Sequence, residues 1–224
     1  MIGFISDIHG NLPALQAVFD ALDEKGVGSV YSLGDVAGYY PMVNECAALL
    51  KERSVPNILG NHDNYLVNNV RCRRSPLVRR AIRYQKSVIT PDNLDWLKKS
   101  ARSFDTPFFF AVHGGLGDFL EEYTEAPVFP GSVKQPLFLC GHTHVQMYGE
   151  DGDKCFCNPG SVGQPRDGDP RASYAIVYDS GLAELCRAEY DIDRIVAETK
   201  RAGLEERYCE GLRTGSPIAP SRRR

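Results

Sequence analysis

Short apolar runs alternate with helical stripes along the first 145 residues of the chain. Each run is followed at once by Gly, Asp, Asn or His and predicts a buried strand. The runs are Ile2–Ile5, Val30–Leu33, Val55–Leu59, Phe108–Val112 and Leu137–Cys140. Between them, apolar residues at helical spacing and Ser-Pro or Thr-Pro starts predict helices. These helices cover Leu12–Lys25, Met42–Arg53, Pro76–Val88 and a stretch from Pro91. The alternation indicates α/β layering.

The later part of the chain has a different pattern. Four short strands joined by turns are predicted, with a hairpin signal at Asp151-Gly152. They are Gln146–Tyr148, Lys154–Cys157, Ser173–Tyr178 and Ala183–Ala188. A helix is predicted over Asp191–Ala202, with 203–212 as its extension. We expect one domain over 1–212 and a disordered tail over 213–224, which has two prolines and ends in three arginines.

Composition narrows the class of protein. The chain has 224 residues, of which 42% are hydrophobic and 25% charged, which suits a globular domain with a real core. Its formal net charge of −3 does not favour a nucleic-acid partner. No apolar run approaches the ~20 residues that span a bilayer. The start of the chain predicts a strand rather than an export signal. Seven cysteines without a framework of spacings therefore suggest reduced thiols and a cytoplasmic protein.

Five polar segments carry the candidate chemistry. They are Asp7-Ile8-His9, Gly34-Asp35, Gly60-Asn61-His62-Asp63, His113-Gly114 and Gly141-His142-Thr143-His144. Each directly follows an apolar run, and together they hold all five histidines of the chain. A single such residue is usually a turn residue, but independent turns do not explain the whole set. Because sites form at the carboxyl ends of strands in open α/β sheets, we expect these side chains to converge.

The residue types predict a metal site. Imidazole together with carboxylate and amide oxygens suits Mn²⁺, Fe²⁺, Co²⁺, Ni²⁺ or Zn²⁺. An all-oxygen set would have suited Mg²⁺ or Ca²⁺. The five segments contain no cysteine, so a closed thiolate zinc site is not expected. The candidate ligands are too numerous for one ion and suit two ions that share a carboxylate.

As a set, and in this order, the five motifs resemble those of the calcineurin-like metallophosphoesterase superfamily. The resemblance covers about residues 1–165. The segment Asn158–Arg166 resembles a loop of the small prokaryotic phosphodiesterase branch, which includes diadenosine tetraphosphatase-related proteins. The resemblance implies an α/β (α+β) fold in the form of a four-layer sandwich, with two facing mixed β-sheets flanked by helices.

The resemblance also implies roles for individual residues. One metal would take Asp7, His9, Asp35 and His144, and the other would take Asp35, Asn61, His113 and His142. Asp35 would bridge the two ions, and a metal-bridging hydroxide would attack the phosphorus of a phosphate ester. His62 would lie over the phosphate as general acid or leaving-group stabiliser, so His62 and Asp35 are the candidate catalytic residues. For Asp63 two interpretations stay open, orienting another group of the site or capping the following helix.

Substrate contacts are harder to predict. Arg166 could meet a substrate phosphate or form an ion pair with Asp167 or Asp169. Tyr39 and Tyr123 could stack on a base or ring, or serve only in packing. The basic stretch from Arg71 to Arg83 predicts either a solvated helix face or a surface for an anionic substrate or partner.

Several functions compete. The leading hypothesis is a phosphodiesterase or nucleotide phosphohydrolase whose partner is a phosphate-ester small molecule or nucleotide, with a diadenosine polyphosphate hydrolase as an alternative. Protein Ser/Thr phosphatases of this superfamily carry a Gly-Asp-x-x-Asp-Arg pattern, and the chain has Gly34-Asp35-Val36-Ala37-Gly38-Tyr39 instead. A metal-binding scaffold, like the retromer subunit of this fold, lacks the catalytic His, whereas His62 is present here. The sequence leaves the oligomeric state open.

Overall fold

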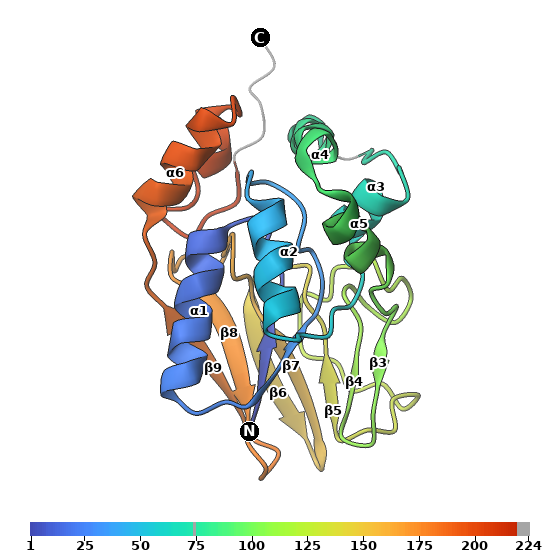
Figure 1. The fold of residues 1–224 in the computed structure, drawn as a ribbon. Helices are drawn as coiled ribbons and strands as arrows, with labels where there is room; N and C mark the ends of the chain where they lie inside the picture. Colours follow the sequence, from blue (N-terminus) through green and yellow to red (C-terminus); the bar gives the residue numbers. More distant parts are fainter. Residues whose placement is uncertain (74, 219–224) are drawn as a thin grey trace.

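Two β-sheets face each other in the computed structural model, which describes residues 1–73 and 75–218 (Figure 1). The first sheet has the strand order β2-β1-β8-β9 and the second the order β3-β4-β5-β7-β6. The first four strands are β1 (Ile2–Ile5), β2 (Ser29–Ser32), β3 (Phe104–Asp105) and β4 (Phe109–Ala111). The others are β5 (Leu137–Leu139), β6 (Gln146–Asp151), β7 (Lys154–Pro159), β8 (Ala172–Val177) and β9 (Ala183–Ala188). Both sheets are mixed, since β1 pairs in parallel with β2 and antiparallel with β8.

Six α-helices and one 3₁₀ helix are present in the described residues. They are α1 (Leu12–Glu24), α2 (Val43–Glu52), α3 (Asn61–Val67), α4 (Pro76–Val88), α5 (Pro91–Lys98), α6 (Ile192–Arg201) and η1 (Glu206–Cys209). The starts of four helices follow from side-chain caps, because each cap oxygen accepts an otherwise unpaired N–H of the first turn. The capping residues are Asn11, Ser75, Thr90 and Asp191.

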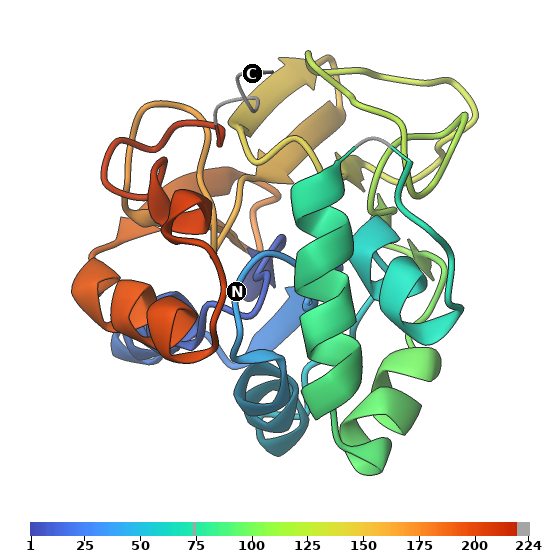
Figure 2. The ribbon, with the colours of Figure 1, turned by 90° about the horizontal axis from the view of Figure 1, so that it is seen from above.

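Alternation along the strands assigns each side chain to one layer of the core. Phe4 of β1, Phe109 of β4 and Ala175 of β8 meet between the two sheets. On the outer face of the first sheet, Ile5 and Ile176 pack under α1 and α2. On the outer face of the second sheet, the aromatic side chain of Phe138 is covered by the irregular segment 114–135 instead of a helix. The helices gather on the side of the first sheet when the molecule is seen from above (Figure 2).

The predicted fold class is confirmed, whereas some predicted elements are wrong. The predicted strand Val55–Leu59 makes only isolated bridges, through Asn57 and Ile58. Pro56 has no N–H to donate, and the cap of α3 follows at Gly60. Residues 203–212 do not extend α6, which ends at Arg201; Gly203 has a φ of +70° and leads to the separate turn η1. The short strand β3 was not predicted.

The end of the chain is partly described. Within the predicted tail, residues 213–218 make defined contacts: Gly215 O accepts from the backbone N–H of Gly168, and Ile218 packs against the cluster around Tyr208. The rest of that predicted tail, 219–224, lies outside the described residues. Among the described residues, no helix is both long and apolar enough to cross a membrane.

Candidate metal centre

The predicted site residues come together where the strands end. Asp7 and His9 follow β1, Asp35 follows β2 and His113 follows β4. His142 and His144 follow β5, and Asn61 is the first residue of α3. Three overlapping groups have ligand atoms within 4.8 Å of one another. These groups are Asp7–His9–His144, His9–Asp35–His62 and Asp35–His113–His142. All of these side chains are buried.

The backbone at this site is held in an unusual conformation. Seven non-glycine residues within the described ranges have positive φ, and five of them are predicted metal ligands. These five are Asp7, His9, Asp35, His142 and His144, with φ between 52° and 66°. Left-handed backbone at a non-glycine residue is strained, and such residues cluster at functional sites. The turns after the strands are therefore shaped to aim side chains inward rather than to relax the chain.

Three imidazoles are fixed through backbone carbonyls. The Nδ1–H groups of His9, His113 and His144 donate to carbonyl oxygens at 2.9, 2.8 and 2.7 Å, respectively. The accepting carbonyls belong to Ala37, Leu33 and Gln164. With Nδ1 protonated, the neutral ring presents a lone pair at Nε2, which is the usual state of a metal-binding histidine.

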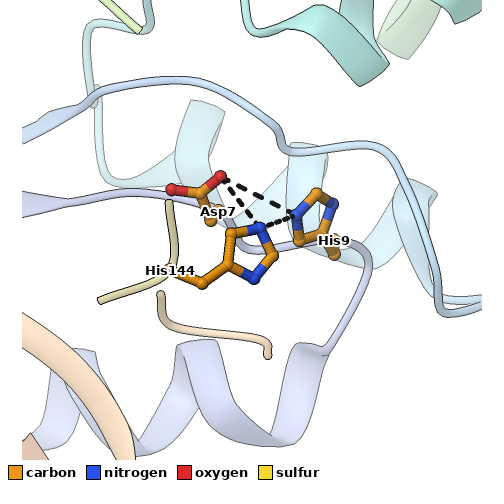
Figure 3. A group of neighbouring side chains, drawn as sticks. All are labelled: Asp7, His9 and His144. Atoms are coloured by element: carbon orange, nitrogen blue, oxygen red, sulfur yellow. Dashed lines mark hydrogen bonds and ion pairs between the residues drawn. The ribbon is translucent and has the colours of Figure 1, made fainter. Parts of the chain in front are cut away.

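The Nε2 atoms of His9 and His144 lie 3.0 Å apart (Figure 3). Two lone pairs at that distance repel unless a cation or a proton lies between them. Oδ1 of Asp7 lies 3.3 Å from His144 Nε2 and has no hydrogen-bond partner, although it is buried. Nε2 of His142 is likewise buried without a partner. Orphaned buried acceptors of this kind fit a bound divalent cation.

Asp35 occupies the middle of the cluster. Its Oδ1 accepts from the backbone N–H of His62 at 2.8 Å, which fixes the carboxylate plane. Its Oδ2 lies 3.5 Å from His113 Nε2 and 3.7 Å from His9 Nε2. Asp35 thus belongs to two of the three ligand groups.

Burial and mutual charge set the protonation states in the absence of metal. Burial opposes ionisation of Asp35, but His113 and His62 outweigh it and hold its pKa well below the usual range. Burial also disfavours charge on the histidines, lowering the pKa of His142 to about 3 and that of His62 to about 4. For His113, Asp35 overcomes burial and raises the pKa to about 10. Ionised carboxylates and mostly neutral imidazoles make a donor set suited to a cation.

His62 stands beside the cluster. Its ring lies 4.7 Å from that of His9 and 5.1 Å from that of Tyr39. Its Nε2 is 4.0 Å from Asp35, and its buried Nδ1 has no hydrogen-bond partner. The residue predicted as general acid therefore lies within the site, and its Nδ1 makes no hydrogen bond to another group of the described chain.

The three predicted substrate residues also lie at the site. Arg166 donates from Nη2 to the hydroxyl of Tyr39 at 3.0 Å and holds its guanidinium over that ring. The suggested ion pairs of Arg166 do not form, since Asp167 pairs with Arg187 and Asp169 with Arg171. Tyr123 is half exposed, and its ring centroid lies 4.2 Å from that of His142.

Asp63 serves both of the roles left open by the sequence. It caps α3 by accepting from the N–H of Gly60, and it also accepts from the N–H groups of Val36 and Ala37. Burial, with the charge of Asp35, raises its pKa to about 7. Gly60 is required because a Cβ there would lie 2.1 Å from Asp35 Oδ1. Asp63 therefore ties the loop that carries Asp35 to the helix that begins at Asn61.

Two supporting glutamines were missed by sequence reasoning. Gln85 of α4 is fully buried, accepts from Gly38 N at 2.9 Å and donates to Tyr40 O at 2.7 Å, which fixes the loop that carries Tyr39. A glutamine in the middle of a helix gives no signal of this role. Gln164 anchors His144 with its backbone carbonyl and accepts from Arg166 with its side chain. Its place in the Asn158–Arg166 loop was the signal that could have found it.

Comparison with known proteins agrees with the fold and gives the family. Residues 1–180 match the model of the calcineurin-like phosphoesterase superfamily domain. The crystal structure of a metallophosphoesterase from Sphaerobacter thermophilus is 32% identical, with a TM-score of 0.82 over 96% of this chain and 98% of that one. The uncharacterized protein MJ0912 of Methanocaldococcus jannaschii is 30% identical over 96% of this chain and 98% of its own length. Phosphodiesterase YfcE of Escherichia coli is 27% identical over 87% of this chain and 96% of its own.

Fold and site together define a metal-dependent hydrolase of phosphoric esters. The chain belongs to the calcineurin-like phosphoesterase superfamily.

Proposed function

We propose that the protein hydrolyses phosphodiesters or nucleotides of low molecular mass with two divalent transition-metal ions. One ion would be held by Asp7, His9, Asp35 and His144, and the other by Asp35, Asn61, His113 and His142. The observation that carries this proposal is the central Asp35, which belongs to two separate ligand groups. Mn²⁺, Fe²⁺, Co²⁺, Ni²⁺ and Zn²⁺ all suit these ligands.

The ions, when bound, would supply an activated water and positive charge for the phosphoryl oxygens. The protein's own contribution is to hold the donors in place. Backbone carbonyls fix the rings of His9, His113 and His144, and the N–H of His62 fixes the Asp35 carboxylate. Because the donors are already oriented, little reorganisation is needed when charge develops in the transition state.

His62 is proposed as the general acid that donates a proton to the leaving oxygen. Its Nδ1 is buried and has no partner, and its neighbours Tyr39 and Tyr65 hold the ring on both sides. Although burial lowers its pKa to about 4 in the metal-free protein, the negative phosphate of a substrate favours the protonated ring. Arg166, linked to Tyr39, is proposed to meet a phosphoryl oxygen, and Tyr123 to stack on the leaving group.

A diester preference is supported by two observations. The relative YfcE is named a phosphodiesterase. The chain also has Gly38-Tyr39 where Ser/Thr phosphatases would place Asp-Arg after Gly-Asp. Seven free cysteines, six of them buried, fit a reducing compartment such as the cytoplasm.

The test is a substrate panel on protein reconstituted with Mn²⁺, Ni²⁺ or Zn²⁺, with metal stoichiometry measured alongside. We expect about two ions per chain and a higher kcat/KM for bis(p-nitrophenyl) phosphate than for p-nitrophenyl phosphate. High monoesterase without diesterase activity would overturn the substrate class. His62→Ala should lower turnover by about 10²–10⁴-fold at unchanged metal content. Full turnover in that variant would remove His62 from the mechanism.

A further inference from the structure

A hollow lies beside the metal centre, where α3 meets α4. It has a volume of about 510 Å³. Four of its lining side chains are basic, namely Arg71, Arg79, Arg83 and Lys86, and none is acidic. Arg79, Arg83 and Lys86 follow one face of α4 at positions i, i+4 and i+7. Arg71, Arg79 and Arg83 of the basic stretch therefore share a concave surface, whereas Arg80 pairs with Glu205 and Arg74 lies outside the described residues.

Among the described residues, no acidic side chain lines this hollow, and the carboxylate of Glu121 accepts from the hydroxyl of Tyr65 at its wall. Within the part of the chain that the structure describes, no carboxylate forms an ion pair with Arg71, Arg79 or Arg83. Arg79 donates to the backbone carbonyl of Cys72 at 3.1 Å. Arg80, the next residue of the same helix, points elsewhere and pairs with Glu205. Like charges four residues apart destabilise a helix slightly, and an anion bound between them would offset this repulsion.

Tyr65 forms the wall between this hollow and the metal centre. It lines the hollow, yet its hydroxyl accepts from Nδ2 of Asn61 at 3.3 Å and its ring lies 5.7 Å from that of His62. Helix α4 is joined to the same centre through Gln85, which holds the Gly38–Tyr40 loop. Through Tyr65 the hollow is therefore a direct neighbour of Asn61 and His62 at the metal centre.

We propose that this hollow binds a second phosphate group of the substrate, while the ester to be cleaved lies at the metal centre. Guanidinium groups are suited to phosphate because they offer paired donors in a fixed plane. The substrate class is then a nucleotide derivative with at least two phosphate groups, one of them not cleaved. This inference rests on the proposed function and adds the requirement that the substrate carries a second phosphate group.

The test compares three p-nitrophenyl esters that release the same group. The first is the p-nitrophenyl ester of thymidine 5′-phosphate, and the second carries an added 3′-phosphate on the same thymidine. In the third, that 3′-phosphate is esterified to one further thymidine 3′-phosphate. We expect kcat/KM to rise by about tenfold or more when the added phosphate reaches the hollow. The rise should shrink with added salt, because the contact is ionic.

The variants are Arg79→Gln/Arg83→Gln and, as matched control on the same helix, Arg80→Gln. The double variant should lose the preference for the phosphorylated esters and keep the rate on the simple ester. Arg80→Gln should keep both. A preference that is absent in the wild type, or that persists in the double variant, would overturn the proposal.

A binding measurement separates the hollow from catalysis. In metal-free protein, thymidine 3′,5′-bisphosphate should raise the melting temperature of the wild type and of Arg80→Gln, and raise that of the double variant less. Equal shifts in all three proteins would contradict the assignment. If the metal-loaded wild type hydrolyses none of the esters, nor bis(p-nitrophenyl) phosphate, the proposed function fails. If it hydrolyses all esters equally well, only the second phosphate site fails.

Discussion

The two halves of the metal centre are built with different degrees of support. In the half formed by Asp7, His9 and His144, each imidazole donates from Nδ1 to a backbone carbonyl. In the half formed by Asp35, His113 and His142, only His113 is held in this way. Nε2 of His142 has no protein partner, and the ring is covered by the half-exposed Tyr123.

This difference shows which histidines of the centre are already held in position before a metal ion binds. A ring fixed by a backbone hydrogen bond loses little freedom when it binds a metal, so the first half should hold its ion more tightly. The second half lies towards Tyr123 and should exchange its ion more readily. Both halves share the carboxylate of Asp35, so substitutions at or near Asp35 test how strongly each half holds its ion.

The largest effect is expected from Asp35→Asn, which removes the charge that both halves share. Metal content should fall below one ion per chain, and activity should fall by at least about a thousandfold, equivalent to about 4 kcal/mol. Metal analysis and kcat/KM on bis(p-nitrophenyl) phosphate check this. Asp169→Asn, which weakens the ion pairs with Arg171 and Arg187 away from the ligands, is the control. Retention of two ions by Asp35→Asn would end the idea of a shared ligand.

The second largest effect is expected in how the free energy of unfolding of the metal-free protein depends on pH. Burial lowers the pKa of His62 to about 4, below the unfolded value of about 6.5. The neutral ring therefore contributes stability above pH 6.5 that is lost as the pH falls towards 4. Relative to His62→Gln, the wild type should lose about 3 kcal/mol more over this range. Urea unfolding between pH 7.5 and 4 measures the difference, and parallel curves would contradict it.

A smaller effect separates His144→Ala from His142→Ala. The two positions are matched, since φ is 62° at His144 and 66° at His142. Loss of His144 leaves the buried carbonyl of Gln164 without its donor and should destabilise the metal-free protein by about 1–3 kcal/mol. His142→Ala should cost less, because Nε2 of His142 has no partner to lose. Equal losses of unfolding free energy would remove the distinction between the halves.

The smallest effect is expected from Asp63→Asn. This side chain accepts three backbone N–H groups from the loop after Asp35 and from the start of α3. It therefore supports the second half at Asn61, and it supports the first half less directly, through Ala37, whose carbonyl accepts from His9. Affinity for the more weakly held ion should fall by about 10–100-fold, and affinity for the tighter ion should fall less. Competition with a chelator resolves the two dissociation steps. A loss of affinity confined to the more tightly held ion would contradict the comparison of the two halves.

The sequence predicted the class of fold and the strand ends at which six of the seven candidate ligands lie, because polar residues directly after apolar runs mark strand ends. Asn61 is the exception, since it begins α3. It did not predict what fixes those ligands. The anchors of His9, His113 and His144 are backbone carbonyls, and a carbonyl is present at every residue regardless of sequence. The role of Gln85 depends on tertiary packing of α4 against the Gly38–Tyr40 loop.

Strand prediction failed where local pattern and tertiary context disagree. The run Val55–Leu59 is apolar enough for a strand, but its only sheet contacts are single bridges to Ser32 and Ala101. The basic stretch was visible in the sequence, whereas its concave shape and its position behind Tyr65 depend on how α3 and α4 pack.

The five left-handed residues of the centre have a consequence for engineering. Glycine adopts a φ near +60° without the penalty that Asp and His carry, so replacing any of them with glycine should relieve local strain in the metal-free chain. The same exchange would remove buried hydrogen bonds, such as the one from His144 to the carbonyl of Gln164. The strained turns are therefore kept by side chains that both hold the loops together and supply the donor atoms.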